Sequence, residues 1–147
     1  MLFKYAFVTA NKYFPIGSGF ATYGSAQAAK SYSVLYQLYG FSNRWGMGAG
    51  ENSFYLNDTY YPMIIGQFGY FGFFIFMFVY YKLFSVFKQI KNNNYKIPLL
   101  YLLALILFAN FGNGGITSIS GVLLMTCLGV VYTISTLDNR NDIKQQR

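Results

Sequence analysis

The stretch that decides the fold runs from residue 59 to residue 81 and reads TYYPMIIGQFGYFGFFIFMFVYY. It contains no Asp, Glu, Lys or Arg, and an apolar helix of about 20 residues is long enough to cross a bilayer. A domain of 147 residues has too little interior to hide such a segment from water. We therefore predict a membrane-spanning helix over residues 60 to 81.

A second uncharged run extends from Ile97 to Leu137 and is about twice as long as one span requires. Within it, the sequence NFGNGG at residues 110 to 115 favours a chain reversal, because Asn and Gly are typical turn residues. We expect a helical hairpin with spans over residues 97 to 112 and 117 to 136. A composition of 54% hydrophobic against 10% charged residues also indicates an all-α integral membrane protein.

The lysines predict the orientation of these three spans. The segment between the first and second spans has no acidic residue and four lysines, Lys82, Lys88, Lys91 and Lys96. Short cytoplasmic loops carry an excess of basic residues, so we place this segment in the cytoplasm.

Three regions follow from this topology. Residues 1–58 form an extracytoplasmic region with short helices, residues 59–137 form the three-span region, and residues 138–147 form a disordered cytoplasmic tail. Residues 5 to 10 are too short for the hydrophobic part of a signal peptide. We therefore expect the chain to be the C-terminal part of a longer multi-span protein.

Two helices are predicted in the extracytoplasmic region. Phe3, Phe7, Ala10 and Phe14 recur at helical spacing, which predicts a helix over residues 2 to 13 that ends before the proline at position 15. A serine at position 25 is a suitable cap for a second helix, which we expect to continue to residue 39 and to end at the glycine at position 40.

The glycine-rich loop between these helices, FPIGSGFATYGS at residues 14 to 25, suggests a phosphate-binding site. It matches neither common nucleotide motif, because Thr22 replaces the third glycine of the dinucleotide fingerprint and Ser25 replaces the P-loop lysine. Its amides remain candidates for binding another anion, with Lys12 beside them. The alternatives are a tight turn between two helices for the glycines and solvation of a helix end for Lys12.

Histidine is absent and the single cysteine, Cys127, lies within a predicted span. These features exclude a histidine-based nucleophile system from this chain. They also argue against a metal site, and we predict no cofactor, no metal and no nucleic-acid partner.

The remaining candidates for chemistry are a few charged and aromatic residues. Asp58 begins the sequence DTYYP at the mouth of the first span, where partial desolvation suits a carboxyl group to proton transfer; its alternative role is to cap the span helix. Arg44 carries a planar guanidinium that matches phosphate oxygens, and Trp45 beside it offers a stacking surface for a sugar or a lipid. Arg44 is equally suited to reaching lipid headgroups. Gln67 is polar and within a span, so we expect it to face other helices.

Three stretches in this order resemble a known family: PIGSGFATYGS at 15–25, YSVLYQLYGFSNRWGMG at 32–48 and NDTYYPMIIGQFGYFGF at 57–73. They are similar to the outward loop and following span of the bacterial oligosaccharide repeat-unit polymerases of capsule and O-antigen assembly, which are relatives of the O-antigen ligases. The resemblance covers about residues 10 to 80. The chain departs from the family in having no arginine before Arg44 and none of the many preceding spans.

The resemblance implies a glycosyltransferase of the bacterial inner membrane. Such an enzyme moves a growing glycan from a polyprenyl diphosphate carrier to the next carrier-linked repeat unit, and its partners include the chain-length regulator and flippase of the same pathway. Arg44 would bind diphosphate and, with Asp58, form the catalytic pair. The predicted substrate-binding residues are Lys12, Gly17, Gly19, Tyr23, Trp45 and Asn57. The alternatives are a non-catalytic membrane subunit, a transporter fragment, or a ligase-type glycan transferase.

Overall fold

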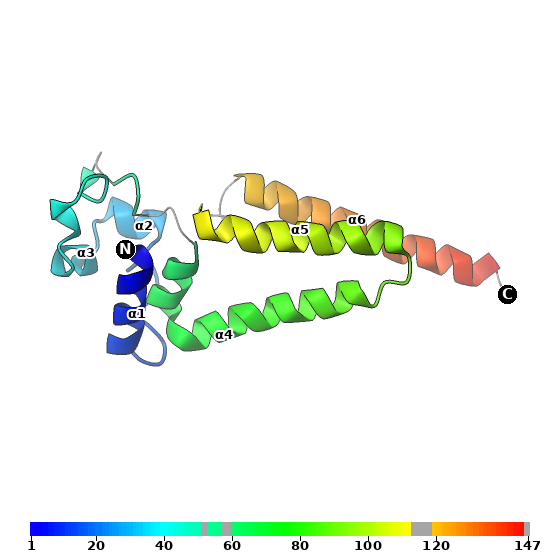
Figure 1. Ribbon diagram of the computed structural model, residues 1–147, viewed down its shortest axis with the longest axis horizontal. Helices are drawn as coiled ribbons and strands as arrows, with labels where there is room; N and C mark the ends of the chain where they lie inside the picture. The colour runs from blue at the N-terminus through cyan, green and yellow to red at the C-terminus, as the bar shows by residue number, and fades with distance from the viewer. Residues whose placement is uncertain (51–52, 57–59, 113–118, 146–147) are drawn as a thin grey trace.

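The computed structural model describes residues 1–50, 53–56, 60–112 and 119–145, with the backbone alone for residues 139–145. All of the regular secondary structure in these residues is helical, as the sequence predicts. The elements are α1 (Leu2–Lys12), α2 (Ala26–Lys30), α3 (Val34–Leu38), the 3-10 helix η1 (Phe41–Asn43), α4 (Tyr60–Lys88), α5 (Asn93–Gly112) and α6 (Ile119–Gln145). Figure 1 shows α4, α5 and α6 extending side by side away from a compact group that contains α1, α2 and α3.

Three helices are long and apolar enough to cross a membrane: α4, α5 and the part of α6 from Ile119 to Asp138. They identify a multi-pass membrane protein. α4 packs against α5, and α5 packs against α6. Their shared core contains Tyr80 and Phe87 of α4, Leu99, Leu103 and Ile106 of α5, and Leu128 of α6.

The ends of these helices differ from the prediction in two places. α4 continues to Lys88 and α5 begins at Asn93, so only residues 89–92 lie between the helices instead of the predicted 82–96. The Asn92 side chain accepts a hydrogen bond from the Asn94 amide at 3.0 Å and so caps α5. α6 continues to Gln145, and the predicted disordered tail is therefore wrong. No glycine or proline interrupts the sequence between residues 130 and 145, so nothing local ends the helix there.

The first three residues of the predicted reversal at residues 110 to 115 belong to α5, which extends to Gly112. Asn110 belongs to the last turn of α5 and is fully buried. Residues 113 to 115 lie outside the described part of the chain. Asn110 is therefore a buried helical residue, where the sequence alone indicated a turn.

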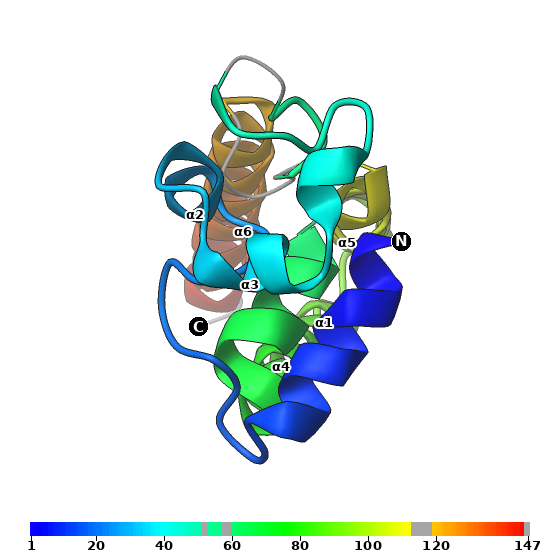
Figure 2. The same cartoon turned by 90° about the vertical axis from the view of Figure 1, so that its left-hand side faces the viewer.

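Residues 1–50 and 53–56, together with the first part of α4, form a unit that we call the N-terminal module. α1 packs against α4, and Figure 2 shows α1 lying beside the first part of α4 at this end of the molecule. The module has its own core of buried nonpolar side chains, which includes Ala6 and Ala10 of α1, Tyr23, Tyr36, Phe41, Leu56 and Ile65.

The helix predicted from residue 25 to residue 39 is two helices, so this prediction is wrong. Ser25 caps α2 as expected, accepting a hydrogen bond from the Ala28 amide at 3.2 Å. The chain then turns at Tyr32, which has a φ of 44°, and Ser33 caps α3 by accepting from the Leu35 amide. Serines bond readily to nearby backbone groups, and this competes with a continuous helix. Gly40, with a φ of 66°, follows α3 as predicted.

α4 is bent at Gly69, where φ is 63° and ψ is −163°. This backbone region is essentially restricted to glycine. Residues 60–68 and 70–88 are therefore two helical segments joined at an angle, which Figure 1 shows. The second segment, at 1.5 Å per residue, is about 28 Å long and matches the hydrocarbon thickness of a bilayer.

Candidate functional site

The glycine-rich loop lies against the bend of α4. The Ser18 amide donates to the Gly66 carbonyl at 3.0 Å, and the Gly19 amide donates to the Gln67 carbonyl at 2.9 Å. In a continuous helix these two carbonyls would accept from the amides four residues further on. The loop therefore supplies the hydrogen bonds that the bend removes from α4.

Gly17 allows this close approach. Its φ is 76°, and a Cβ atom there would collide with the backbone of Gly69 and Gln67. Gly19 has a φ of 97°, and a Cβ atom there would meet no other atom within 4 Å. Because the Ser18 and Gly19 amides already donate to α4, they are not free to bind an anion in this arrangement. The structure thus gives Gly17 a packing role and the Gly19 amide a hydrogen bond to α4. Contact of either glycine with a substrate stays a prediction.

The side chain of Gln67 forms two further hydrogen bonds to the same loop. Its side chain is 1% exposed; Nε2 donates to the Tyr23 carbonyl at 2.6 Å, and Oε1 accepts from the Ala21 amide at 3.1 Å. The prediction that Gln67 faces other helices is wrong. The bend turns the first segment of α4 into the N-terminal module, so Gln67 meets a loop there instead of a neighbouring span.

Tyr23 and Tyr36 are fully buried in the module. The Tyr23 hydroxyl donates to the Leu2 carbonyl at 2.7 Å, and the Tyr36 hydroxyl accepts from the Gly24 amide at 2.7 Å. Burial raises the pKa of Tyr36 to about 12 and also raises the pKa of Tyr23, because the charged form of each would be desolvated. Tyr23, a predicted substrate-binding residue, has no surface to offer a substrate in this arrangement.

Arg44, Trp45 and Lys12 are exposed, in contrast to the buried tyrosines. Arg44 follows η1, and its guanidinium has no hydrogen-bond or ion-pair partner within the described ranges. Trp45 is 83% exposed and packs against Tyr55 with ring centroids 5.6 Å apart. Lys12 ends α1, with Nζ 5.6 Å from the centre of the Tyr13 ring. The module therefore presents an exposed cation next in sequence to an exposed indole ring, the pair that the sequence suggested.

The other two predicted site residues, Asn57 and Asp58, lie outside the described residues.

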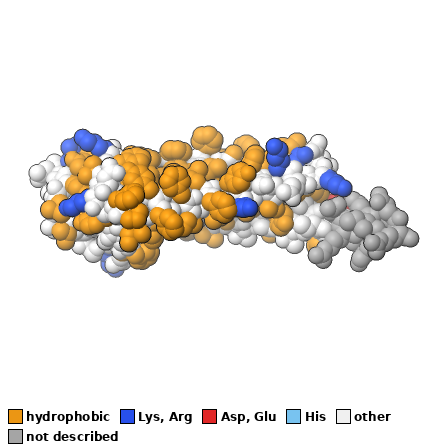
Figure 3. Space-filling model, turned by 90° about the horizontal axis from the view of Figure 1, so that it is seen from below, with side chains coloured by type: hydrophobic (Ala, Val, Ile, Leu, Met, Phe, Trp, Pro, Cys, Tyr) orange, Lys and Arg blue, Asp and Glu red, His pale blue; other side chains and the backbone are white. Residues whose placement is uncertain are grey.

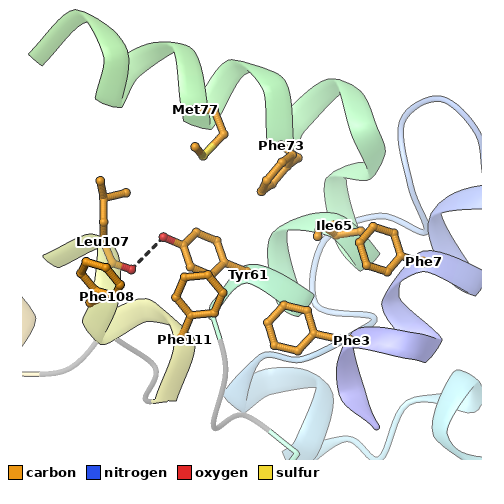
Figure 4. Close-up of a pocket in the computed structure, with 9 residues that line it drawn as sticks. All are labelled: Phe3, Phe7, Tyr61, Ile65, Phe73, Met77, Leu107, Phe108 and Phe111. Atoms are coloured by element: carbon orange, nitrogen blue, oxygen red, sulfur yellow. Dashed lines mark hydrogen bonds between the residues drawn. The ribbon is translucent and has the colours of Figure 1, made fainter. Parts of the chain in front are cut away.

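A nonpolar groove lies where the module meets the spans, and the sequence did not predict it. Its volume is 370 Å³, within the range of about 300 to 1,000 Å³ that is typical of ligand pockets. Figure 4 shows side chains from three helices around it: Phe3 and Phe7 of α1; Tyr61, Ile65, Phe73 and Met77 of α4; and Leu107, Phe108 and Phe111 of α5.

The bend of α4 creates this groove, because the lining residues of α4 come from both of its segments. In Figure 1, α4 and α5 converge where residues 89–92 join them and diverge toward the module. Among the described lining residues only Tyr61 carries a hydroxyl, and it donates to the Leu107 carbonyl at 2.8 Å. The groove therefore offers a hydrocarbon surface and suits a nonpolar chain.

The described residues contain no group of three His, Cys, Asp or Glu side chains that could hold a metal ion. Cys127 is exposed on α6. The chemistry of the described surface thus comes from cations, aromatic rings and the nonpolar groove.

Comparison with protein-family models, with curated proteins and with solved structures finds no match to this chain. The resemblance to the repeat-unit polymerases therefore rests on the three quoted stretches of sequence. The fold and the site define the class of protein as a multi-pass helical membrane protein with a compact module at one end of its spans.

Proposed function

We propose that this chain is the C-terminal part of a bacterial inner-membrane glycosyltransferase that polymerises polyprenyl-diphosphate-linked oligosaccharide repeat units into capsular or O-antigen polysaccharide. The observation that carries the proposal is the nonpolar groove at the junction of module and spans. A lipid-linked glycan needs a hydrocarbon surface for its carrier and a polar surface for its head group, and the exposed Arg44 and Trp45 of the module offer the latter.

In this proposal residues 1–58 face the outside of the cell, and the lysines near residues 82 to 96 face the cytoplasm. Arg44 holds a diphosphate through its bidentate fork, Trp45 stacks on a sugar, and Lys12 is a second cation for the same head group. Asp58 accepts the proton of the attacking hydroxyl. The chain-length regulator and flippase of the pathway are the proposed protein partners.

Substitutions of Arg44, introduced into the chromosomal gene of the native host, test the proposal. A charge-assisted hydrogen bond contributes about 1.5 to 3 kcal/mol, so Arg44→Ala should reduce polymer formation about ten- to a hundredfold. Arg44→Lys keeps the charge without the fork and should lose less. Lys30→Ala, which removes an exposed cation from the same module, is the matched control and should be neutral. Glycan chain lengths on a gel, at matched protein levels, provide the measurement.

A photoreactive polyprenyl diphosphate tests the groove directly. Purified protein in lipid should be labelled on peptides that contain Phe73, Met77 or Phe108, and unlabelled polyprenyl diphosphate should compete. Labelling spread evenly over all three spans, without competition, would contradict a carrier site at this groove.

A second candidate is a non-catalytic membrane subunit, and one observation favours it. The glycine-rich loop and Tyr23, which the resemblance assigns to a substrate, are occupied by packing within the module. For such a subunit, Arg44→Ala, Arg44→Lys and Lys30→Ala should all give normal chain lengths. Equal, near-native ladders from the three variants would therefore replace the enzyme proposal with this one.

A further inference from the structure

The loop between α1 and α2 exposes three large nonpolar side chains, which we call the apolar tip. Phe14 is 70%, Ile16 is 69% and Phe20 is 81% exposed. No charged residue occurs between Lys12 and Lys30. Single exposed hydrophobic residues are ordinary on a protein surface, whereas a group of them marks an interaction site.

The backbone of this loop is held in place, so the tip cannot turn inward to bury its side chains. The Ser18 and Gly19 amides donate to carbonyls of α4, and the Phe71 amide donates to the Pro15 carbonyl at 3.4 Å. Gly17 is in direct contact with the bend of α4 at Gly69. The exposed side chains therefore project from a fixed platform.

The apolar tip is continuous with the exposed face of the span that follows the bend. Phe20 lies 6.4 Å from Phe68 and Phe14 lies 6.3 Å from Tyr70, measured between ring centroids. Beyond these residues the exposed face of α4 carries Phe71, Phe74, Ile75, Phe78 and Tyr81, which line a shallow nonpolar groove with Met77. Figure 3, which views the molecule from below in the sense of Figure 1, shows this band of hydrophobic side chains extending from the module along the spans.

Polar groups of α1 and of Tyr70 lie next to the tip. Lys12 ends α1 and is exposed, and the Tyr70 hydroxyl donates to Asn11 Oδ1 at 2.7 Å. In Figure 1, α1 crosses the direction of the three spans, and the loop that follows it lies beside the bend of α4. Tyrosine and lysine at this level are typical of the boundary between lipid tails and headgroups.

We propose that Phe14, Ile16 and Phe20 insert into the lipid leaflet around the bend of α4 and anchor the N-terminal module to the membrane surface. The partner is the acyl region of the bilayer, because the tip continues the surface by which α4 meets lipid. Lys12 lies at headgroup depth, where it is attracted to anionic lipids. This anchoring goes beyond the proposed enzymatic function and does not depend on it.

Single cysteines at Phe14, Ile16 and Phe20 test the proposal in a Cys127→Ser background. Each is labelled with an environment-sensitive fluorophore, and the protein is reconstituted in vesicles of phosphatidylcholine and phosphatidylglycerol. Val34 and Leu38 are 67% and 63% exposed and provide matched controls. They lie on α3, at the end of the molecule farthest from the spans in Figure 1.

We expect at least a threefold stronger quenching of the tip probes than of the control probes by lipids with a spin label in the acyl chain. Iodide in the aqueous phase should quench the control probes and spare the tip probes. If iodide quenches the tip probes as strongly as the control probes, the tip lies in the aqueous phase and the proposal is overturned. Tip probes shielded from both quenchers would overturn it in favour of a protein partner. All three positions are exposed, and circular dichroism of each variant verifies folding, so any one folded variant decides the test.

Discussion

Gln67 is the residue on which the junction of module and membrane depends most directly. Its side chain is 1% exposed and makes two hydrogen bonds: Nε2 donates to the Tyr23 carbonyl, and Oε1 accepts from the Ala21 amide. Removing these two hydrogen bonds leaves the buried Tyr23 carbonyl and Ala21 amide without partners, which costs more free energy than the hydrogen bonds themselves contribute. Gln67 is therefore a structural residue within a helix that otherwise suits lipid.

Gln67→Leu should lower the free energy of unfolding by about 2 to 4 kcal/mol, because it preserves the size of the side chain and removes both hydrogen bonds. Titration with a denaturing detergent in mixed micelles measures the change. Gln37→Leu, at an exposed position on α3, is the matched control and should change stability by less than about 0.5 kcal/mol. Equal effects of the two variants would show that the buried hydrogen bonds of Gln67 contribute little.

Tyr36 makes the module sensitive to alkali. Its pKa is raised from 10.0 to about 12 by burial, so the folded state retains a proton that the unfolded state loses above pH 10. The stability contribution is complete below pH 10 and is lost as the pH rises from 10 to 12. Tyr36→Phe should make the loss of helicity with rising pH less steep over this range. Part of the remaining slope is due to Tyr23, whose pKa is also raised by burial. Circular dichroism against pH gives the slope, and an unchanged slope in the variant would contradict the assignment.

At the scale of elements, the bend of α4 and the loop after α1 form one unit. The bend removes helical hydrogen bonds from the Gly66 and Gln67 carbonyls, and the loop returns partners to both. Neither feature is stable alone in a nonpolar setting, where an unpaired carbonyl is costly. We infer that the bend and the loop form together during folding.

Two alanine variants distinguish the effect of a steric clash with α4 from the effect of backbone strain at a positive φ. Gly17 and Gly19 both have positive φ, so alanine at either position carries a strain of about 1 to 2 kcal/mol. Gly17→Ala should lose about 1 to 3 kcal/mol more, because its Cβ would meet the α4 backbone. The Ser18 and Gly19 amides should then exchange with deuterium faster in Gly17→Ala than in Gly19→Ala. Similar stability and exchange in both variants would mean that the loop tolerates displacement from α4.

At the scale of the whole molecule, the bend sets where the first span begins. Residues 60–68 contribute to the core of the module through Ile65, while residues 70–88 pack against α5. The second segment of α4 therefore leaves the module in a new direction, and the nonpolar groove is lined by both segments of α4 together with α1 and α5.

The orientation of the molecule in the membrane is testable by chemical labelling. Single cysteines at Ser42 and Asn92, both exposed, are introduced in a Cys127→Ser background. If the lysine-rich end of the spans is cytoplasmic, a membrane-impermeant maleimide should label Ser42→Cys in intact cells, and Asn92→Cys only after the cells are opened. Labelling of Asn92→Cys alone in intact cells would reverse the orientation and remove the module from the side proposed for glycan assembly.

The sequence by itself determined the class of fold. Uncharged runs longer than a bilayer is thick leave a chain no alternative to membrane helices, and this property depends on composition alone. Local signals predicted the position of α1, the Ser25 cap and the start of α4 at Tyr60, but not the division of residues 26–38 into two helices. Arg44 and Trp45, which the sequence suggested as substrate contacts, are exposed, and their contact with a substrate stays a prediction.

Only the tertiary structure decided how these elements meet. Glycine at position 69 permits a bend without requiring one, and the bend exists because a loop about 50 residues earlier in the chain supplies its hydrogen bonds. The same long-range contact buries Gln67, and packing within the module buries Tyr23, although both are polar residues that the sequence assigned to other surroundings. The groove requires side chains from α1, both segments of α4 and α5. Contacts between such distant residues depend on packing in three dimensions, which no local pattern of residues encodes.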